Sequence, residues 1–199
     1  METEKMPGHL ILIVAVPGAG KSVLLAHIKK MRPELSFAVS CTTRPERPGE
    51  VNGETYYFIS EAEFKRRIKA GEFLEWVQQD GGRYYGTLNS EIVGRIKAGE
   101  IVLREVEVIG AIAFKKLLPP ENVSVIYITA GTWDEMEMRM IARAPISKKE
   151  LEFRKERYER EIQFADEADY VIANTNGNLD VAKAEIIGIV DTIIDKVNQ

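Results

Sequence analysis

Apolar runs alternate with segments of helical periodicity along most of this chain. Residues 10–14 and 123–128 are apolar at almost every position, which is typical of strands buried on both faces of a parallel sheet. In residues 151–165 and in residues 179–197, apolar side chains recur at the spacing of amphipathic helices. Strands that alternate with helices in this way predict an α/β sandwich of three layers with a parallel central sheet.

Residues 40–90 depart from this alternation. Prolines and glycines exclude a helix or a central strand from residues 41–53. A strand-like run follows at residues 56–59, then a helix that begins at the capping box of residues 60–63, and then an alternating strand at residues 72–77. We therefore expect this block to be an inserted subdomain that binds a substrate.

Carboxylates occupy positions in the strands where they could meet a ligand. A strand expected at residues 101–108 would place Glu105 and Glu107 on one face at its carboxyl end, where open α/β sheets bind ligands. An ordinary exposed strand face is the alternative. Glu75 alternates with apolar neighbours, so it faces either solvent or a ligand.

The other expected elements are a first helix that stops before Pro33, a strand at residues 37–40, a helix at residues 92–98, helices that begin at two further capping boxes (Thr132 with Glu135 and Ser147 with Glu150) and a last strand at residues 170–173.

A strand-to-helix junction near the N-terminus carries the clearest candidate chemistry. The segment Ala15-Val16-Pro17-Gly18-Ala19-Gly20-Lys21-Ser22 fits the broader form of the P-loop pattern, with alanine where the strict form has glycine. Its glycines let successive N–H groups point at a phosphate chain, and the helix N-terminus adds a favourable dipole. Lys21 can reach the β- and γ-phosphates, and Ser22 can hold Mg²⁺. A glycine-rich turn with a chance lysine is the alternative, but the preceding strand and following helix favour a nucleotide site.

Two groups of arginines could bind further phosphates. Arg44 and Arg47 lie three residues apart among hydroxyl side chains, and guanidinium groups pair with phosphate oxygens in a bidentate way. A solvated basic loop is the alternative at this position. The second group consists of Arg139, Arg143 and Arg154, which lie in and between two expected helices.

Composition and charge narrow the classes of function. The 199 residues, 45% hydrophobic and 29% charged, suit one globular domain. A net charge of −4 argues against non-specific nucleic-acid binding, which needs a broad positive field. No apolar run approaches the ~20 residues that span a bilayer, and the N-terminus lacks signal-peptide features, so we expect a cytoplasmic protein without a membrane partner. The single cysteine, Cys41, is expected to stay reduced.

Three segments together resemble the guanylate kinase family, and the resemblance extends over residues 10–194. They are Ser40-x-Thr42-Thr43-Arg44-x-x-Arg47-x-Gly49-Glu50-x-x-Gly53-x-x-Tyr56-x-Phe58, Gly71-Glu72-Phe73-Leu74-Glu75-Trp76 and Tyr84-Tyr85-Gly86-Thr87. The resemblance implies a P-loop kinase sandwich with an inserted GMP-binding subdomain and a helical lid. It also implies transfer of the γ-phosphoryl group of ATP to GMP with Mg²⁺. The parts of this single domain would be a core at residues 9–39, 91–137 and 157–199, an insert at residues 40–90 and a lid at residues 138–156.

The resemblance further implies roles for particular residues. The positions matched to ATP binding are Pro17, Gly18, Ala19, Gly20, Lys21, Ser22, Val23 and Asn174. Those matched to the GMP phosphate are Ser40, Arg44, Arg47, Tyr56 and Tyr85, and those matched to guanine are Glu75, Thr87 and Glu107. Ser22 and Glu105 match the metal site, and Lys21, Arg44, Arg139, Arg143 and Arg154 match the catalytic positions. A carboxylate such as Glu75 can accept from both N1–H and the 2-amino group of guanine, a pairing that adenine cannot offer.

Several positions differ from the family pattern. Pro17 removes a backbone donor beside the phosphate cradle, and Glu107 and Ile109 stand in place of the usual aspartate and glutamine. Ala142 and Ala144 replace glycines beside a lid arginine, which implies a stiffer lid and slower turnover.

Two other functions are compatible with parts of the pattern. One is a non-catalytic guanylate-kinase-like module that binds GMP or phosphorylated protein partners, and the other is a related kinase of a sugar phosphate. The retained Lys21 and lid arginines argue against the first, and Glu75 with Thr87 argues against the second.

Overall fold

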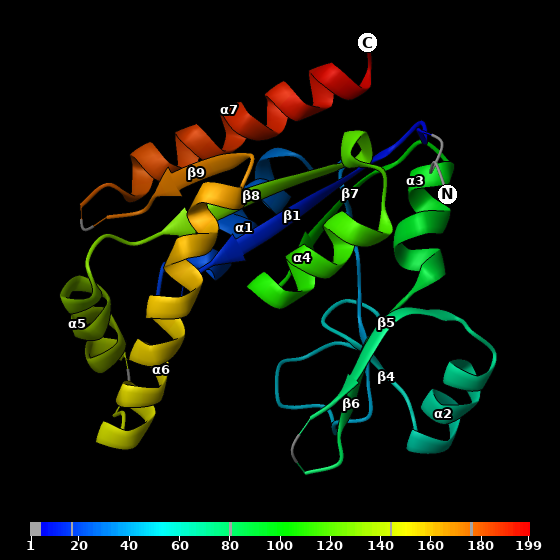
Figure 1. Ribbon diagram of the computed structural model, residues 1–199, viewed down its shortest axis with the longest axis horizontal. Coiled ribbons are helices and arrows are strands. Elements are labelled where there is room, and N and C mark those ends of the chain that lie inside the picture. Colours follow the sequence, from blue (N-terminus) through cyan, green and yellow to red (C-terminus); the bar gives the residue numbers. More distant parts are fainter. Residues whose placement is uncertain (1–4, 17, 80, 144, 176) are drawn as a thin grey trace.

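The computed structural model describes residues 5–16, 18–79, 81–143, 145–175 and 177–199 (Figure 1). A five-stranded sheet lies at its centre, with the order β2-β7-β1-β8-β9 and parallel pairing between neighbours. Its strands are β1 (His9–Ala15), β2 (Ser36–Phe37), β7 (Ile101–Glu105), β8 (Val123–Thr129) and β9 (Tyr170–Ala173). β1 and β8 are almost wholly buried, because helices cover both faces of the sheet. The predicted parallel sheet is therefore confirmed.

Helices form the outer layers of the sandwich. On one side α1 (Lys21–Met31) packs beside the long α7 (Leu179–Val197), and α4 (Val108–Leu117) lies on the other side (Figure 1). A π-helical turn (Ser90–Gly94) leads into the short α3 (Arg95–Lys97), and 3₁₀ turns occupy Pro120–Asn122 and Ile162–Glu167. Within the described ranges, no helix is both long enough and apolar enough to cross a membrane.

Residues 41–88 contain a second, four-stranded sheet with the order β4-β3-β6-β5, in the lower right of Figure 1. Its elements are β3 (Cys41–Thr42), β4 (Tyr57–Phe58), α2 (Glu61–Lys69), β5 (Phe73–Gln78) and β6 (Tyr84–Leu88). Cys41, Phe64 and Tyr84 form a small separate core beneath this sheet. Burial raises the pKa of the Cys41 thiol to about 11, so it stays protonated and unreactive.

A pair of helices follows β8 and lies in the lower left of Figure 1. The helices are α5 (Trp133–Arg143) and α6 (Lys148–Glu161). The hydroxyl of Thr132 accepts a hydrogen bond from the backbone N of Glu135, and Ser147 accepts one from Glu150 at 3.2 Å. Ser60 caps α2 in the same way. All three predicted capping boxes therefore begin helices.

Two predicted strands are too long. The pattern predicts a strand over residues 101–108, but β7 ends at Glu105 and α4 begins at Val108. Glu107, with φ −82° and ψ 164°, is the extended residue before that helix. The β-branched residues here favour a strand locally, but the helix buries Ala111 and Phe114 against the core, and tertiary packing overrides the local preference. The two glutamates therefore do not share a strand face. The second strand likewise covers only Ser36–Phe37.

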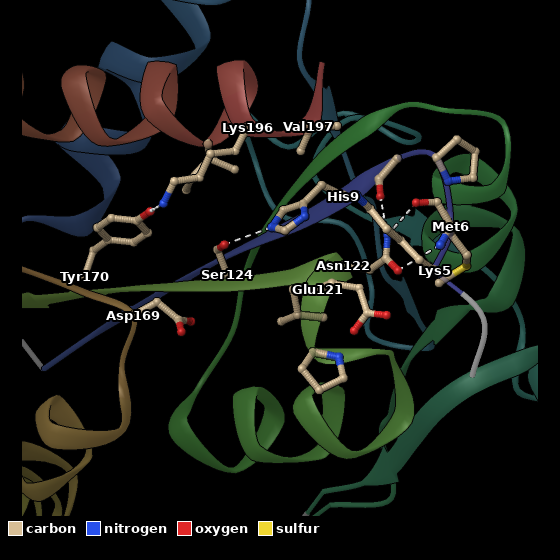
Figure 2. Close-up of a pocket in the computed structure, with 15 residues that line it drawn as sticks. Lys5, Met6, His9, Glu121, Asn122, Ser124, Asp169, Tyr170, Lys196 and Val197 are labelled. Atoms are coloured by element: carbon tan, nitrogen blue, oxygen red, sulfur yellow. Dashed lines mark hydrogen bonds between the residues drawn. The ribbon is translucent and has the colours of Figure 1, made fainter. Parts of the chain in front are cut away.

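A cavity of about 490 Å³ opens at the amino ends of β1 and β8, on the edge of the sheet opposite the P-loop (Figure 2). The Nε2 atom of His9 lies 2.8 Å from the Ser124 hydroxyl. The Asn122 side chain binds the backbone of the incoming N-terminal segment, and Lys196 donates to the Tyr170 hydroxyl at 3.1 Å. These polar groups bind one another, and the bonds of Asn122 hold the N-terminal segment at the edge of the sheet.

His9 is expected to make the stability of the fold depend on pH. Burial lowers the pKa of its imidazole from 6.5 to about 4, although the backbone of Glu121 and the charge of Asp169 oppose this change. Between these two values the unfolded chain binds a proton that the folded chain does not, so stability falls as the pH falls. The loss is at most about 3 kcal/mol.

Urea unfolding of the wild type and of His9→Gln, near pH 7 and near pH 4.5, measures this contribution. Carboxylates affect both proteins alike, so the wild type should lose more stability on acidification than the variant. Equal losses would contradict the assignment to His9.

Candidate active site

The carboxyl end of β1 turns directly into α1, and this turn is the predicted P-loop. Gly18 and Gly20 have φ values of 83° and 76°, in the left-handed region that favours glycine. A Cβ atom on Gly20 would lie 2.6 Å from Nδ2 of Asn174, so a larger residue would displace the loop from Asn174. Pro17 lies outside the described residues.

Asn174, which follows β9, is buried beneath the P-loop. Its Nδ2 donates to the carbonyl oxygen of Ala19 at 2.7 Å, and Arg139 donates to the carbonyl oxygen of Asn174 at 2.8 Å. These two bonds connect the P-loop, the end of β9 and helix α5. Asn174 therefore supports the P-loop, and its contact with adenine stays a prediction.

A cavity of about 610 Å³, called here the P-loop cavity, lies over this loop. Its lining includes Gly18, Ala19, Gly20, Lys21, Ser22, Val23, Glu107, Arg139 and Arg154. Arg154 donates from Nε to Glu150 at 2.8 Å on the same helix. Ala144 and the side chain of Arg143 lie outside the described residues. Two of the three predicted lid arginines thus line the same cavity as the P-loop lysine.

Lys21 pairs with the carboxylate at the end of β7. Its Nζ lies 2.7 Å from Oε1 of Glu105, which is placed there because β7 runs beside β1 in the sheet. Ser22, the residue after Lys21, is exposed and carries a hydroxyl group. Mg²⁺ accepts such oxygen ligands together with waters and phosphate oxygens. The described residues contain no cluster of three or more His, Cys, Asp or Glu that could hold a metal ion.

A second cavity of about 490 Å³, called here the insert cavity, is bounded by α1, β7 and the start of the insert. Its lining includes Ser22, Ser40, Tyr56, Arg104 and Glu105. Ser22 lines both this cavity and the P-loop cavity, and Glu105 pairs with Lys21. The two cavities therefore meet at Ser22, beside the Lys21–Glu105 pair.

Arg44 is held in the insert by Glu50, a partner that sequence reasoning missed. The guanidinium is only 6% exposed and donates to both carboxylate oxygens of Glu50, at 2.9 and 2.7 Å. It also lies 5.5 Å from the ring centre of Tyr56. The hydrogen bond from Arg44 lowers the pKa of Glu50, so the carboxylate stays ionised. The available signal was an acidic residue six positions after the arginine in the same loop.

The other residues predicted for the acceptor phosphate lie around Arg44, with one exception. The rings of Tyr56 and Tyr85 meet edge to face at 6.1 Å, and Ser40 lines the insert cavity with Tyr56. Arg47 is exposed on the loop, where its backbone N donates to Glu50 at 2.8 Å. Four of the five predicted residues thus lie together, and Arg47 is exposed at the surface.

Glu75 faces Thr87 across the paired strands β5 and β6. Its Oε1 accepts hydrogen bonds from the Thr87 hydroxyl at 2.5 Å and from Arg104 at 3.1 Å. Sequence reasoning did not single out Arg104, whose only signal was a basic residue after the apolar run 101–103. Glu107, the third residue predicted for guanine, lines the P-loop cavity and does not join this cluster.

The fold and the site together define a P-loop phosphotransferase. A parallel sheet carries the phosphate loop after its first strand, and two cavities that each include basic residues in their lining meet at Ser22, beside the loop lysine. Two phosphate-bearing molecules can therefore be brought together there.

Comparisons with known proteins identify the family. A family model described as guanylate kinase matches residues 7–191. The guanylate kinase of Thermotoga maritima is 36% identical over 93% of this chain and 87% of its own length, and that of Nostoc sp. is 40% identical over 85% and 83%. The crystal structure of guanylate kinase from Anaplasma phagocytophilum shares the fold, with a TM-score of 0.65 and 24% identity over 96% of this chain and 87% of that one. The chain belongs to the guanylate kinase family.

Proposed function

We propose that this chain transfers the γ-phosphoryl group of ATP to GMP, yielding ADP and GDP. Relatives that carry the name guanylate kinase match 85% and 93% of the chain, and the family model covers its core, P-loop and insert. The chain is therefore an ATP:GMP phosphotransferase. The structural observation that carries the assignment is the meeting of two cavities at Ser22 and the Lys21–Glu105 pair.

The P-loop cavity is the site assigned to ATP. Backbone N–H groups of the loop and the N-terminus of α1 attract phosphates, and Lys21, the first residue of that helix, lines the cavity. The Ser22 hydroxyl and the Glu105 carboxylate would hold Mg²⁺, which would neutralise negative charge on the phosphates. Arg139 and Arg154, which also line this cavity, are assigned to supply positive charge where negative charge moves during transfer. Arg143 is assigned to the same role from the sequence.

The insert cavity is the site assigned to GMP. Ser40 and Tyr56 line this cavity, and Arg44 and Tyr85 contact Tyr56. The phosphate of GMP is assigned to these four residues and, from the sequence, to Arg47 in the same loop as Arg44. The base is assigned to Glu75 and Thr87, and from the sequence also to Glu107, which lines the P-loop cavity. Such an arrangement sets an acceptor phosphate oxygen beside Lys21, and positioning of this kind is the main requirement of phosphoryl transfer.

Water must be kept from the transferred group, since its attack would hydrolyse ATP. We assign closure over the substrates to residues 138–156, which carry the lid arginines, within one domain whose insert is residues 40–90. Because both substrates are small cytoplasmic nucleotides, we place the protein in the cytoplasm, and the net charge of −4 gives it no general attraction to nucleic acid.

An ADP-release assay with ATP, Mg²⁺ and GMP tests the proposal. We expect ADP to appear only when all three are present, and chelation of the cation by EDTA to stop the reaction. A protein that binds GMP in calorimetry but forms no GDP at saturating ATP would instead be a non-catalytic binding module.

A further inference from the structure

Arg104 is a charged side chain in the interior of the main sheet. It is the fourth residue of β7, pairs in register with Leu12 of β1, and is only 8% exposed. Burial of a guanidinium is costly unless hydrogen bonds and a nearby anion compensate it. Each N–H donor of the buried guanidinium therefore needs a hydrogen-bond partner.

The protein satisfies Arg104 only in part. One terminal nitrogen donates to Glu75 at 3.1 Å, and the guanidinium lies 5.5 Å from the ring centre of Phe114. The Nε atom is buried and has no hydrogen-bond partner in the described part of the chain. An unpaired buried donor is destabilising, and such groups in folded proteins usually have a functional reason.

The accessible part of Arg104 faces a ligand site. Arg104 lines the insert cavity together with Ser40 and Tyr56. On Glu75 both contacts fall on Oε1, and Oε2 makes none with the described residues. The Glu75–Arg104 pair thus offers a ligand a carboxylate acceptor directly beside a guanidinium donor.

We propose, on the basis of the GMP site proposed above, that Arg104 recognises the 6-oxo group of the purine by donating a hydrogen bond to it. Guanine places the O6 acceptor next to the N1–H and 2-amino donors that suit Glu75, and O6 with N7 is the edge that arginine most often contacts. Adenine carries a 6-amino donor at that position, which would meet the guanidinium unfavourably. Arg104 is then a specificity-determining residue that selects 6-oxopurines.

A substrate altered at one atom separates this role from a merely structural one. 6-Thioguanosine 5′-monophosphate keeps the N1–H and 2-amino donors and replaces O6 with sulfur, a poorer acceptor. We expect the wild type to prefer GMP over this analogue by about tenfold in kcat/KM. In Arg104→Met the preference should fall to about twofold or less, because GMP loses the contact and the analogue has little to lose.

Two further variants support the comparison. Arg95→Met is the matched control, since Arg95 is a partly buried arginine that pairs with Glu91 and Glu100 and does not line the insert cavity, and it should keep the wild-type preference. Arg104→Gln, which is too short to replace the guanidinium but remains polar, serves if the methionine variant does not fold.

The outcomes are distinct. If a folded Arg104 variant loses both substrates equally and keeps the tenfold preference, Arg104 only holds Glu75 in place and the proposal is wrong. If the wild type forms no GDP, the proposed phosphoryl transfer is wrong, and this result alone does not contradict the role of Arg104. In that case calorimetry measures the dissociation constants of GMP and of the analogue, and the ratio of the two constants in the wild type and in the variant tests the role of Arg104. A wild type that binds neither nucleotide overturns both proposals.

Discussion

Replacement of Lys21 with alanine is expected to lower kcat for ATP-dependent GDP formation by about 10²- to 10³-fold and to leave the Kd for GMP almost unchanged. Lys21 begins α1 directly after the P-loop, and its Nζ lies 2.7 Å from Glu105 where the two cavities meet. In the proposed mechanism, a charge at this point acts on the phosphate oxygens during transfer. Binding of the GMP phosphate is assigned instead to Arg44 and its neighbours in the insert.

Lys30→Ala is the matched control, because Lys30 is an exposed lysine in the last turn of the same helix. It should keep wild-type turnover. A coupled ADP-release assay and calorimetry with GMP measure the two quantities separately. Normal turnover in Lys21→Ala would refute the kinase mechanism, and a comparable loss of GMP binding would mean that Lys21 acts through Glu105 on the insert cavity.

The second large effect concerns the base. The wild type should use GMP better than AMP by on the order of 10⁴-fold in kcat/KM, because a site built on hydrogen bonds rejects a ligand that leaves its polar groups unpaired. Glu75→Gln should lose most of the GMP activity, since the amide presents a donor where guanine also has donors. Equal use of GMP and AMP by the wild type would overturn the assignment of guanine.

The structure also predicts that Glu75→Gln lowers the stability of the fold. Glu75→Gln removes the anion beside the buried guanidinium of Arg104, so the variant should fold but lose about 1–3 kcal/mol of stability. Glu72→Gln is the control, because Glu72 forms its ion pairs with Arg66 and Arg67 at the surface of the insert, where such pairs contribute little. Thermal unfolding followed by circular dichroism compares the three proteins. If Glu75→Gln does not fold, the comparison of GMP with AMP in the wild type alone tests the assignment of guanine.

Much of the fold could be predicted because its signals are local. The apolar runs of β1 and β8, the capping boxes of α2, α5 and α6 and the full extent of Leu179–Val197 depend on residues within a few positions of one another. The P-loop is equally local, since its glycines, lysine and serine are consecutive and the backbone conformation of Gly18 and Gly20 follows from that sequence. The family resemblance likewise rested on such contiguous segments.

Other features were decided only by tertiary packing. Glu105 and Glu107 fit one alternating strand, but burial of α4 ended β7 between them, because a strand end and the extended residue before a helix have the same local pattern. Arg104 reaches Glu75 across 29 positions of sequence, and only the placement of the insert against β7 brings the two together. By itself the sequence determined the elements and the phosphate loop. Contacts between side chains distant in the chain, which shape the proposed base site, depend on how those elements pack.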